Sequence, residues 1–247
     1  MAEDGPRGTA PASGVADLTG EATLAARARE HPFGPSAPSI LATEHWGLLA
    51  SRSLIWNEAM SRANVFLTVL SAAIIALALV ANATGFGPRT TTLALVLLPV
   101  VLLLGIATFV RLVQINTEDA KLVLAMNRLR HAYLRIEPGL EPYFTTGDHD
   151  DERGMETSYM LHRLTRAGIW AYFLVSTPTI VATVDAALAT VIVVLIARVA
   201  EAPWAVATAA GVATFAAVFG VLFPLQREIR RSLRDTGTRF PTPPVAP

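Results

Sequence analysis

Four long apolar segments alternate with polar, charged stretches along the chain. They cover about residues 65–83, 93–110, 172–197 and 204–225. The hydrocarbon core of a bilayer is about 30 Å thick, and roughly 20 helical residues are needed to cross it. Each segment is expected to be a helix, because unpaired backbone groups are costly in lipid. The pattern therefore predicts an all-α, polytopic membrane protein whose four transmembrane helices form two hairpins.

The polar stretches also carry helical patterns. Amphipathic helices over about residues 41–62 and 155–166 are expected to lead into the first and third spans. After the second span, apolar residues recur at alternating spacings of three and four, as in a coiled-coil seam that only Asp119 interrupts. This heptad seam consists of Leu112, Ile115, Leu122, Met126, Leu129, Tyr133 and Ile136. Its helix should end at Glu137, because the residue before a proline avoids helical dihedrals. Packing within one chain and packing against a second copy both remain open.

The domain organisation follows from these segments. Both ends of the chain are rich in Pro, Gly or Ala and lack a helical or strand period, so we expect them to be disordered. The predicted ends are a disordered segment at 1–39 and a disordered proline-rich tail at 236–247. Residues 40–137 should hold the first lead-in helix, the first hairpin and the heptad helix, and an acidic connection should follow at 138–154. Residues 155–235 should hold the second lead-in helix, the second hairpin and a basic exit helix.

The basic residues predict the orientation. The two short hairpin connections carry few arginines, whereas the opposite side carries many, including a run after the fourth span made of Arg227, Arg230, Arg231 and Arg234. The positive-inside rule then places both termini and the middle connection in the cytoplasm. Each basic residue near the surface adds about 1 kcal/mol of attraction to anionic lipid. We therefore expect the bilayer, and anionic lipid at its cytoplasmic face, to be partners.

Composition agrees with a membrane protein. Hydrophobic residues make up 52% of the 247-residue chain, and its mean hydropathy is +0.45. Lys121 is the only lysine, and an arginine- and alanine-rich composition is typical of a GC-rich bacterium, so the bacterial inner membrane is the expected location. Acids and bases balance at 20 each, which gives no argument for a nucleic acid partner. The absence of cysteine excludes disulfides, thiolate metal sites and a cysteine nucleophile.

Asp185 is the one acidic residue within an otherwise apolar segment. Burial in lipid favours the neutral, protonated carboxyl, which can donate a hydrogen bond. Its predicted position is near the middle of the third span, with Thr214 and Ser71 at matching depth as candidate partners. A proton or cation relay is one interpretation, since intramembrane acids are functional candidates by default. A structural hydrogen bond between helices is the other.

Two further patterns were candidates for binding or packing. The stretch GDHDDE at 147–152 contains groups that bind divalent cations, but its spacing fits no EF-hand loop, so a solvated acidic connection without a metal is expected. The fourth span carries small residues at spacings that allow close helix packing. They are Ala207, Ala209, Gly211, Ala213, Ala216, Ala217 and Gly220. Packing on the third span and packing on another subunit are equally compatible with this face.

The stretches ATEHWGLLASRSLIWNEAMSRA, ATFVRLVQINTED and MNRLRHAYL resemble a group of uncharacterised bacterial integral membrane proteins. The resemblance covers the first two spans and the heptad helix, and it implies no activity. In layout, the first half is also similar to the two-span membrane effector domains of bacterial conflict systems, although this chain has four spans.

The functional expectation is a non-enzymatic membrane protein. The sequence contains no phosphate loop, metal-ligand spacing or nucleophile–base pattern, so neither catalysis nor a cofactor is predicted. A self-associating scaffold or interaction protein, present as a homo-oligomer, is the first hypothesis. An ion- or proton-conducting oligomer that uses Asp185 is the alternative.

Overall fold

The computed structural model describes residues 33–225 and 237–244, apart from the side chains of His162 and Phe223. Within these residues the protein is all-helical. Four helices are long and apolar enough to span a membrane: α2 (Ala37–Thr84), α3 (Pro88–Ile136), α6 (Thr177–Val199) and α7 (Trp204–Leu225). The prediction of an all-α protein with four spans is therefore confirmed.

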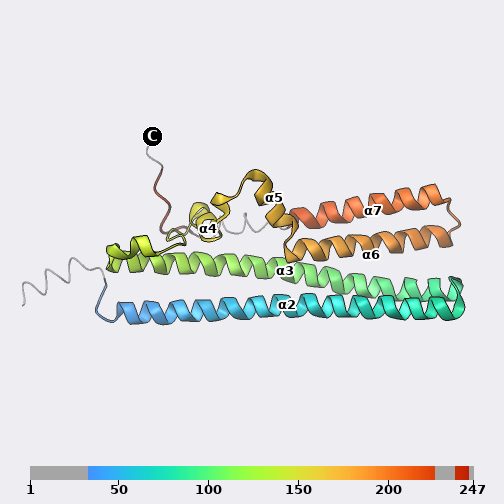
Figure 1. Ribbon diagram of the computed structural model, residues 1–247, viewed down its shortest axis with the longest axis horizontal. Helices are drawn as coiled ribbons and strands as arrows, with labels where there is room; N and C mark the ends of the chain where they lie inside the picture. The colour runs from blue at the N-terminus through green and yellow to red at the C-terminus, as the bar shows by residue number, and fades with distance from the viewer. Residues whose placement is uncertain (1–32, 226–236, 245–247) are drawn as a thin grey trace, which may run out of the picture.

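Helices α2 and α3 form a long antiparallel pair (Figure 1). A 49-residue helix is about 70 Å long at 1.5 Å per residue, which is far more than a bilayer core needs. Gly85 makes the tight turn between the two helices with a φ of 72°, a conformation that favours glycine. Helix α3 ends at Ile136, directly before the Glu137–Pro138 pair, as the sequence predicts.

The expected lead-in helix at 41–62 and the first span form one continuous helix. Both long helices extend beyond the apolar segments, over residues 37–64 and 111–136. We call these extensions the polar layer, together with the short helices η1 (Pro138–Tyr143), α4 (Glu152–Ser158), η2 (Leu161–Arg163) and α5 (Arg166–Leu174).

The structure differs from the sequence prediction around 155–166, where one lead-in helix was expected. Helix α4 ends at Ser158, and Met160 adopts a left-handed backbone with a φ of 57°. Thr165 then caps α5 by accepting a hydrogen bond from the Gly168 N–H at 3.2 Å. The chain therefore changes direction between α4 and α5 rather than continuing as one helix.

The third span is also shorter than the predicted segment of 172–197. Helix α5 ends at Leu174, and α6 begins at Thr177 with Pro178 in its first turn. Proline is well tolerated at a helix start because its missing N–H would have no partner there. Pro178 therefore lies at the start of a separate helix and not inside a longer one.

Helices α2, α3 and α6 share one hydrophobic core. This core includes fully buried side chains from α2 and α3, such as Phe66, Phe109 and Ile115, together with Ala182 of α6. Helix α7 packs on α6, on the side away from α2 (Figure 1). In the most apolar 18-residue stretch of each spanning helix, 17% of the residues of α2 and 11% of those of α7 are buried, compared with 33% in α3 and in α6. The described residues of a single chain thus leave the outer faces of α2 and α7 uncovered.

Residues 237–244 lie along the connection between α3 and α4. The Asp150 N–H donates to the Phe240 carbonyl oxygen at 3.2 Å, and Arg128 donates to the Gly237 carbonyl oxygen at 3.0 Å. A disordered tail was expected for 236–247, so the structure differs from that expectation over these eight positions. The predicted basic run at 227–234 and most of the predicted disordered segment at 1–39 lie outside the described residues.

Candidate functional site

Asp185 is fully buried where α6 meets α3 and α2. Its carboxyl group lies against the backbone of Gly105, and a Cβ on Gly105 would overlap this carboxyl and come within 2.9 Å of the Phe66 ring. Phe66 is at the start of the first apolar segment, next to the polar layer. The carboxyl therefore lies slightly on the polar-layer side of the middle of α6.

The expected partners of Asp185 are engaged elsewhere. Ser71 donates to the Leu67 carbonyl oxygen and Thr214 to the Ala210 carbonyl oxygen, each at 2.8 Å within its own helix. Both carboxyl oxygens of Asp185 are buried without a hydrogen-bond partner among the described residues. An ionised carboxylate in such a place would be very costly, so the group is expected to be neutral. Within the single chain, Asp185 does not reach solvent.

One pair from the small-residue face of α7 packs on α6. Ala207 and Gly211 are buried, and a Cβ on Gly211 would lie 2.9 Å from Val194 and 3.2 Å from Thr190. This part of the face therefore packs within the chain. The remaining small residues are exposed: Ala209, Ala213, Ala216, Ala217 and Gly220.

The heptad seam packs largely within the chain. Leu112, Ile115 and Met126 are at most 2% exposed, and the first two share the core with Ala59 of α2. The other seam residues are partly buried: Leu122, Leu129, Tyr133 and Ile136. Packing within the chain therefore accounts for the three buried residues of the seam.

Asp119, which interrupts the seam, is the centre of a buried polar cluster. The Arg52 Nε donates to Asp119 Oδ1 at 2.6 Å, and the Trp56 indole donates to the same oxygen at 3.1 Å. The Tyr159 hydroxyl donates to Asp119 Oδ2 at 2.5 Å. The cluster joins α2, α3 and the end of α4, which positions the connection on the polar layer. Sequence analysis noted Asp119 only as an interruption; a charged residue at a seam position was the signal that it needed a partner.

The predicted solvated acidic connection is instead packed and hydrogen-bonded. Asp150 is 3% exposed and accepts hydrogen bonds from Arg128 and from the N–H groups of Arg239 and Phe240. Burial acts to raise the pKa of Asp150, but these donors outweigh it and hold the pKa below its ordinary value. Asp151 caps α4 at Gly154 and binds Thr242. The two acids therefore hold residues 237–244 in place.

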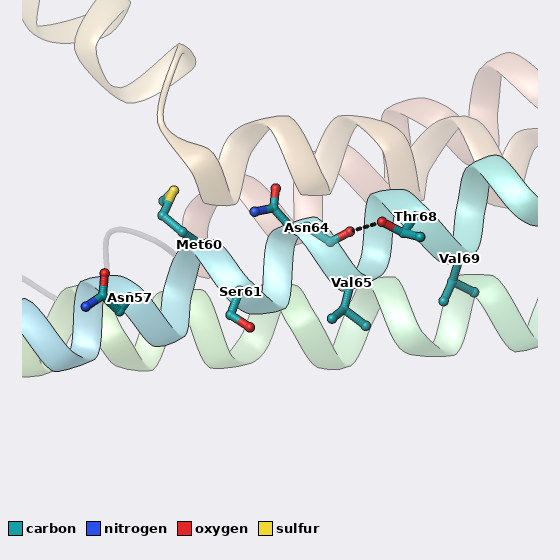
Figure 2. A pocket seen from close by; sticks show the side chains of 7 residues that line it. All are labelled: Asn57, Met60, Ser61, Asn64, Val65, Thr68 and Val69. Carbon is teal, nitrogen blue, oxygen red and sulfur yellow. Dashed lines mark hydrogen bonds between the residues drawn. The ribbon is translucent and has the colours of Figure 1, made fainter.

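An exposed stripe, polar at six of its eight positions and apolar at Ile75 and Ala78, runs along the outer face of α2, opposite α3. Its residues recur at alternating spacings of four and three, so they line one face of the helix. They are Asn57, Ser61, Asn64, Thr68, Ser71, Ile75, Ala78 and Asn82, and all are exposed. Figure 2 shows the part where the stripe leaves the polar layer, a shallow groove lined by Asn57, Met60, Ser61, Asn64, Val65, Thr68 and Val69. We call this set of eight residues the α2 stripe.

Three members of the α2 stripe, Asn57, Ser61 and Asn64, have side chains that make no hydrogen bond to any residue that the structure describes. The hydroxyls of Thr68 and Ser71 donate to carbonyl oxygens of their own helix, and so does the Asn82 amide. Of the three unpaired side chains, those of Asn57 and Asn64 are amides, which carry both donors and an acceptor. Asn64 directly precedes the first apolar segment, and an unpaired amide at the edge of the hydrocarbon is costly because lipid offers it no partner. Sequence analysis missed the stripe because it searched for apolar rather than polar periodicity.

Comparison of the chain with protein-family models, curated proteins and solved structures gave no match.

Proposed function

We propose that the protein is a non-enzymatic scaffold of the bacterial inner membrane whose copies associate through the α2 stripe. The observation that carries this proposal is the exposed, mostly polar stripe on a face of α2 that no other helix within residues 33–225 covers. Both termini and the polar layer are proposed to face the cytoplasm, following the distribution of arginine.

A second copy of the chain is the partner that best fits the stripe. Copies inserted in the same orientation are related by a two-fold axis along the membrane normal, which places each residue of the stripe opposite itself. Asn57 then faces its own copy, and so does Asn64. A side-chain amide is both donor and acceptor, so each pair is self-complementary. Polar residues at such seam positions also fix register, as a buried asparagine does in coiled coils.

The shape of the molecule supports a scaffold. The α2–α3 pair projects well beyond the apolar segments, and several large apolar side chains on the projecting part of α2 are exposed, including Ile40 at 65%, Trp46 at 70% and Leu54 at 69%. Pairing through α2 would place two such projections side by side. This arrangement presents a broad surface to other proteins on one side of the membrane.

Conduction through Asp185 is the alternative function. Its support is the unpartnered carboxyl, but that group is fully buried in the single chain. Conduction therefore requires an oligomer or an open state in which water reaches α6. Proton and potassium flux in liposomes tests it directly, because flux that falls in Asp185→Asn would favour this alternative over a scaffold.

The scaffold proposal is tested by the oligomeric state of the purified protein in liposomes, counted by single-molecule photobleaching over a range of protein densities. We expect dimers for the wild type. Interhelical hydrogen bonds contribute about 0.6 kcal/mol each on average and up to about 1.7 kcal/mol. Losing both asparagine pairs in Asn57→Ala/Asn64→Ala should therefore weaken dimerisation about tenfold or more.

The matched control replaces two exposed polar residues outside the stripe, Thr92→Ala and Thr208→Ala. Each of these hydroxyls already donates within its own helix. The control should dimerise like the wild type. A wild type that stays monomeric at every density, or a double asparagine variant that dimerises unchanged, would contradict the proposal.

A further inference from the structure

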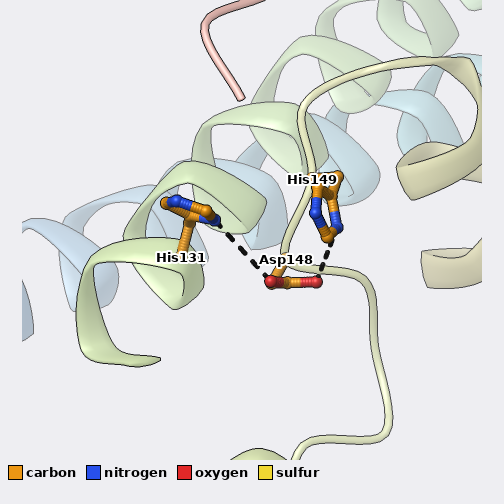
Figure 3. A group of neighbouring side chains, drawn as sticks. All are labelled: His131, Asp148 and His149. Atoms are coloured by element: carbon orange, nitrogen blue, oxygen red, sulfur yellow. Dashed lines mark ion pairs between the residues drawn. The ribbon is translucent and has the colours of Figure 1, made fainter. Parts of the chain in front are cut away.

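Three potential metal ligands from separate parts of the sequence converge where α3 meets the connection. His131 is on α3, and Asp148 and His149 are on the connection (Figure 3). The His149 Nδ1 lies 2.8 Å from Asp148 Oδ1, and the His131 Nδ1 lies 3.7 Å from Asp148 Oδ2. One nitrogen or oxygen atom from each residue lies within 4.8 Å of the other two.

The Nδ1 atom of His131 is the unusual feature of this cluster. It is buried, and it has no hydrogen-bond partner among the described residues. At 3.7 Å, the Asp148 oxygen that it faces is too far away for a hydrogen bond. Buried polar atoms are nearly always satisfied, so an orphaned ring nitrogen that faces a carboxylate and a second imidazole points to a missing ligand.

The donor set fits a particular class of ion. Imidazole nitrogen suits Zn²⁺ and its first-row neighbours, whereas Mg²⁺ and Ca²⁺ prefer all-oxygen sites. Zn²⁺ binds nitrogen and carboxylate oxygen at about 2.0–2.2 Å in a tetrahedron, so its ligand atoms lie about 3.4 Å apart. The distances from the Asp148 carboxylate oxygens to His149 and His131, 2.8 Å and 3.7 Å, lie on either side of that value. Small side-chain rotations would bring the three ligand atoms to the spacing that Zn²⁺ needs. The three side chains are 23% to 27% exposed, which allows water to occupy a fourth position.

The surrounding contacts hold the connection ready for such an ion. The fully buried Asn127 donates to the His149 carbonyl oxygen at 2.8 Å, and Arg130 donates to the Gly147 carbonyl oxygen at 3.2 Å. Gly154 packs so closely on the His149 backbone that a Cβ there would overlap it. The backbone on both sides of Asp148 is thus fixed to α3 and α4. Ligands held in this way lose less entropy when the ion binds.

From these observations we propose that His131, Asp148 and His149 bind a divalent transition-metal ion of the Zn²⁺ type. The ion would join α3 to the connection between α3 and α4, next to residues 237–244. The Phe240 ring stacks on the His131 ring with 4.3 Å between their centroids, so the docked segment covers one side of the site. Metal binding and docking of this segment therefore stabilise each other. The proposal is independent of self-association through α2.

The test is Zn²⁺ binding to the full-length protein, freed of any affinity tag and treated with chelator, measured by isothermal titration calorimetry. We expect one Zn²⁺ per chain with micromolar or tighter affinity and a higher melting temperature when the ion is present. Mg²⁺ and Ca²⁺ should not compete. Loss of a residue that only hydrogen-bonds a metal ligand already costs about 10–100-fold in metal affinity. Loss of a ligand itself in His131→Asn or His149→Asn should therefore weaken binding by about 100-fold.

The matched control is His45→Asn, because His45 is in the same polar layer and stacks on Tyr133 rather than on the cluster. It should bind Zn²⁺ like the wild type. Asp148→Asn provides a third ligand variant if a histidine variant fails to fold, as judged by circular dichroism. Co²⁺ should give the absorption spectrum of tetrahedral ligation in the wild type and lose it in the ligand variants. Absence of binding by the wild type, or equal affinity in wild type and all folded ligand variants, would overturn the proposal.

Discussion

The carboxyl group of Asp185 lies directly against the backbone of Gly105, so that these two residues bring α6 and α3 into close contact. No side chain larger than hydrogen fits at Gly105, because the Phe66 ring closes the same space. The acid thus takes part in a close contact between the two hairpins. This geometry gives Asp185 a packing role that does not depend on a hydrogen bond.

Gly105→Ala should destabilise the protein. The added methyl would overlap Asp185, and overpacking of this kind typically costs about 1–3 kcal/mol. We expect a lower melting temperature for the detergent-purified protein. Gly220→Ala is the matched control, since Gly220 is also within a spanning helix but has nothing within 4 Å of its added Cβ. Adding Asp185→Ala should restore part of the stability lost in Gly105→Ala, and an unchanged melting temperature in Gly105→Ala would contradict the observed packing.

Tyr159→Phe should weaken the buried cluster around Asp119. Burial, and then the nearby Asp119 carboxylate, raise the pKa of Tyr159 above its ordinary value, so the hydroxyl remains a donor at neutral pH. Removing one donor from a buried carboxylate costs about 1–3 kcal/mol. The measurement is chemical denaturation followed by circular dichroism. Tyr143→Phe, at a side chain that is 77% exposed, should have almost no effect, and equal stability of the two variants would argue against a structural role for the cluster.

Docking of residues 237–244 should depend on pH through Asp150. Its folded-state pKa is below the ordinary aspartate value of about 3.9, so its stabilising contribution is complete above that value. The contribution is lost as the pH falls through the folded-state pKa, which places release of the segment below about pH 4. Spin labels at Lys121→Cys and Thr238→Cys would report the distance between α3 and the segment.

The same labels provide a variant test at neutral pH. Asp150→Asn should release the segment at pH 7, because the neutral amide binds Arg128 and the backbone N–H groups more weakly than the carboxylate does. Glu141→Gln, at an exposed acid of the neighbouring turn, should leave the distance unchanged. If the labelled distance in Asp150→Asn matches that of the wild type at every pH, Asp150 does not hold the segment.

Local sequence features predicted the large elements well. The four spans follow from apolar length alone, and the end of α3 at Ile136 follows from the proline two positions later. The break at Met160 was not predictable in this way. The two residues before Met160 contact α3 by tertiary hydrogen bonds: Ser158 donates to Asn127, and Tyr159 donates to Asp119. Such tertiary contacts override local helix propensity.

The candidate sites also divide into those that local sequence indicates and those that depend on tertiary packing. His131 is 17 positions before Asp148, and only the packing of the connection on α3 brings them together, so no local motif indicated a metal site. The position of Asp185 against Gly105 likewise depends on how α6 packs on α3. The α2 stripe, by contrast, was readable from sequence, because Asn57, Asn64 and Ser71 repeat every seven residues.

Disulfide cross-linking in liposomes tests association through the α2 stripe most directly. The chain has no cysteine, so a single introduced thiol can cross-link only to the same position of another copy. Thr68 and Leu67 are both exposed and lie at nearly the same depth, but they point about 100° apart around α2. We predict that Thr68→Cys forms a dimer on oxidation and that Leu67→Cys does not. Equal cross-linking of the two variants, or none in Thr68→Cys at densities where the wild type is dimeric, would contradict the account.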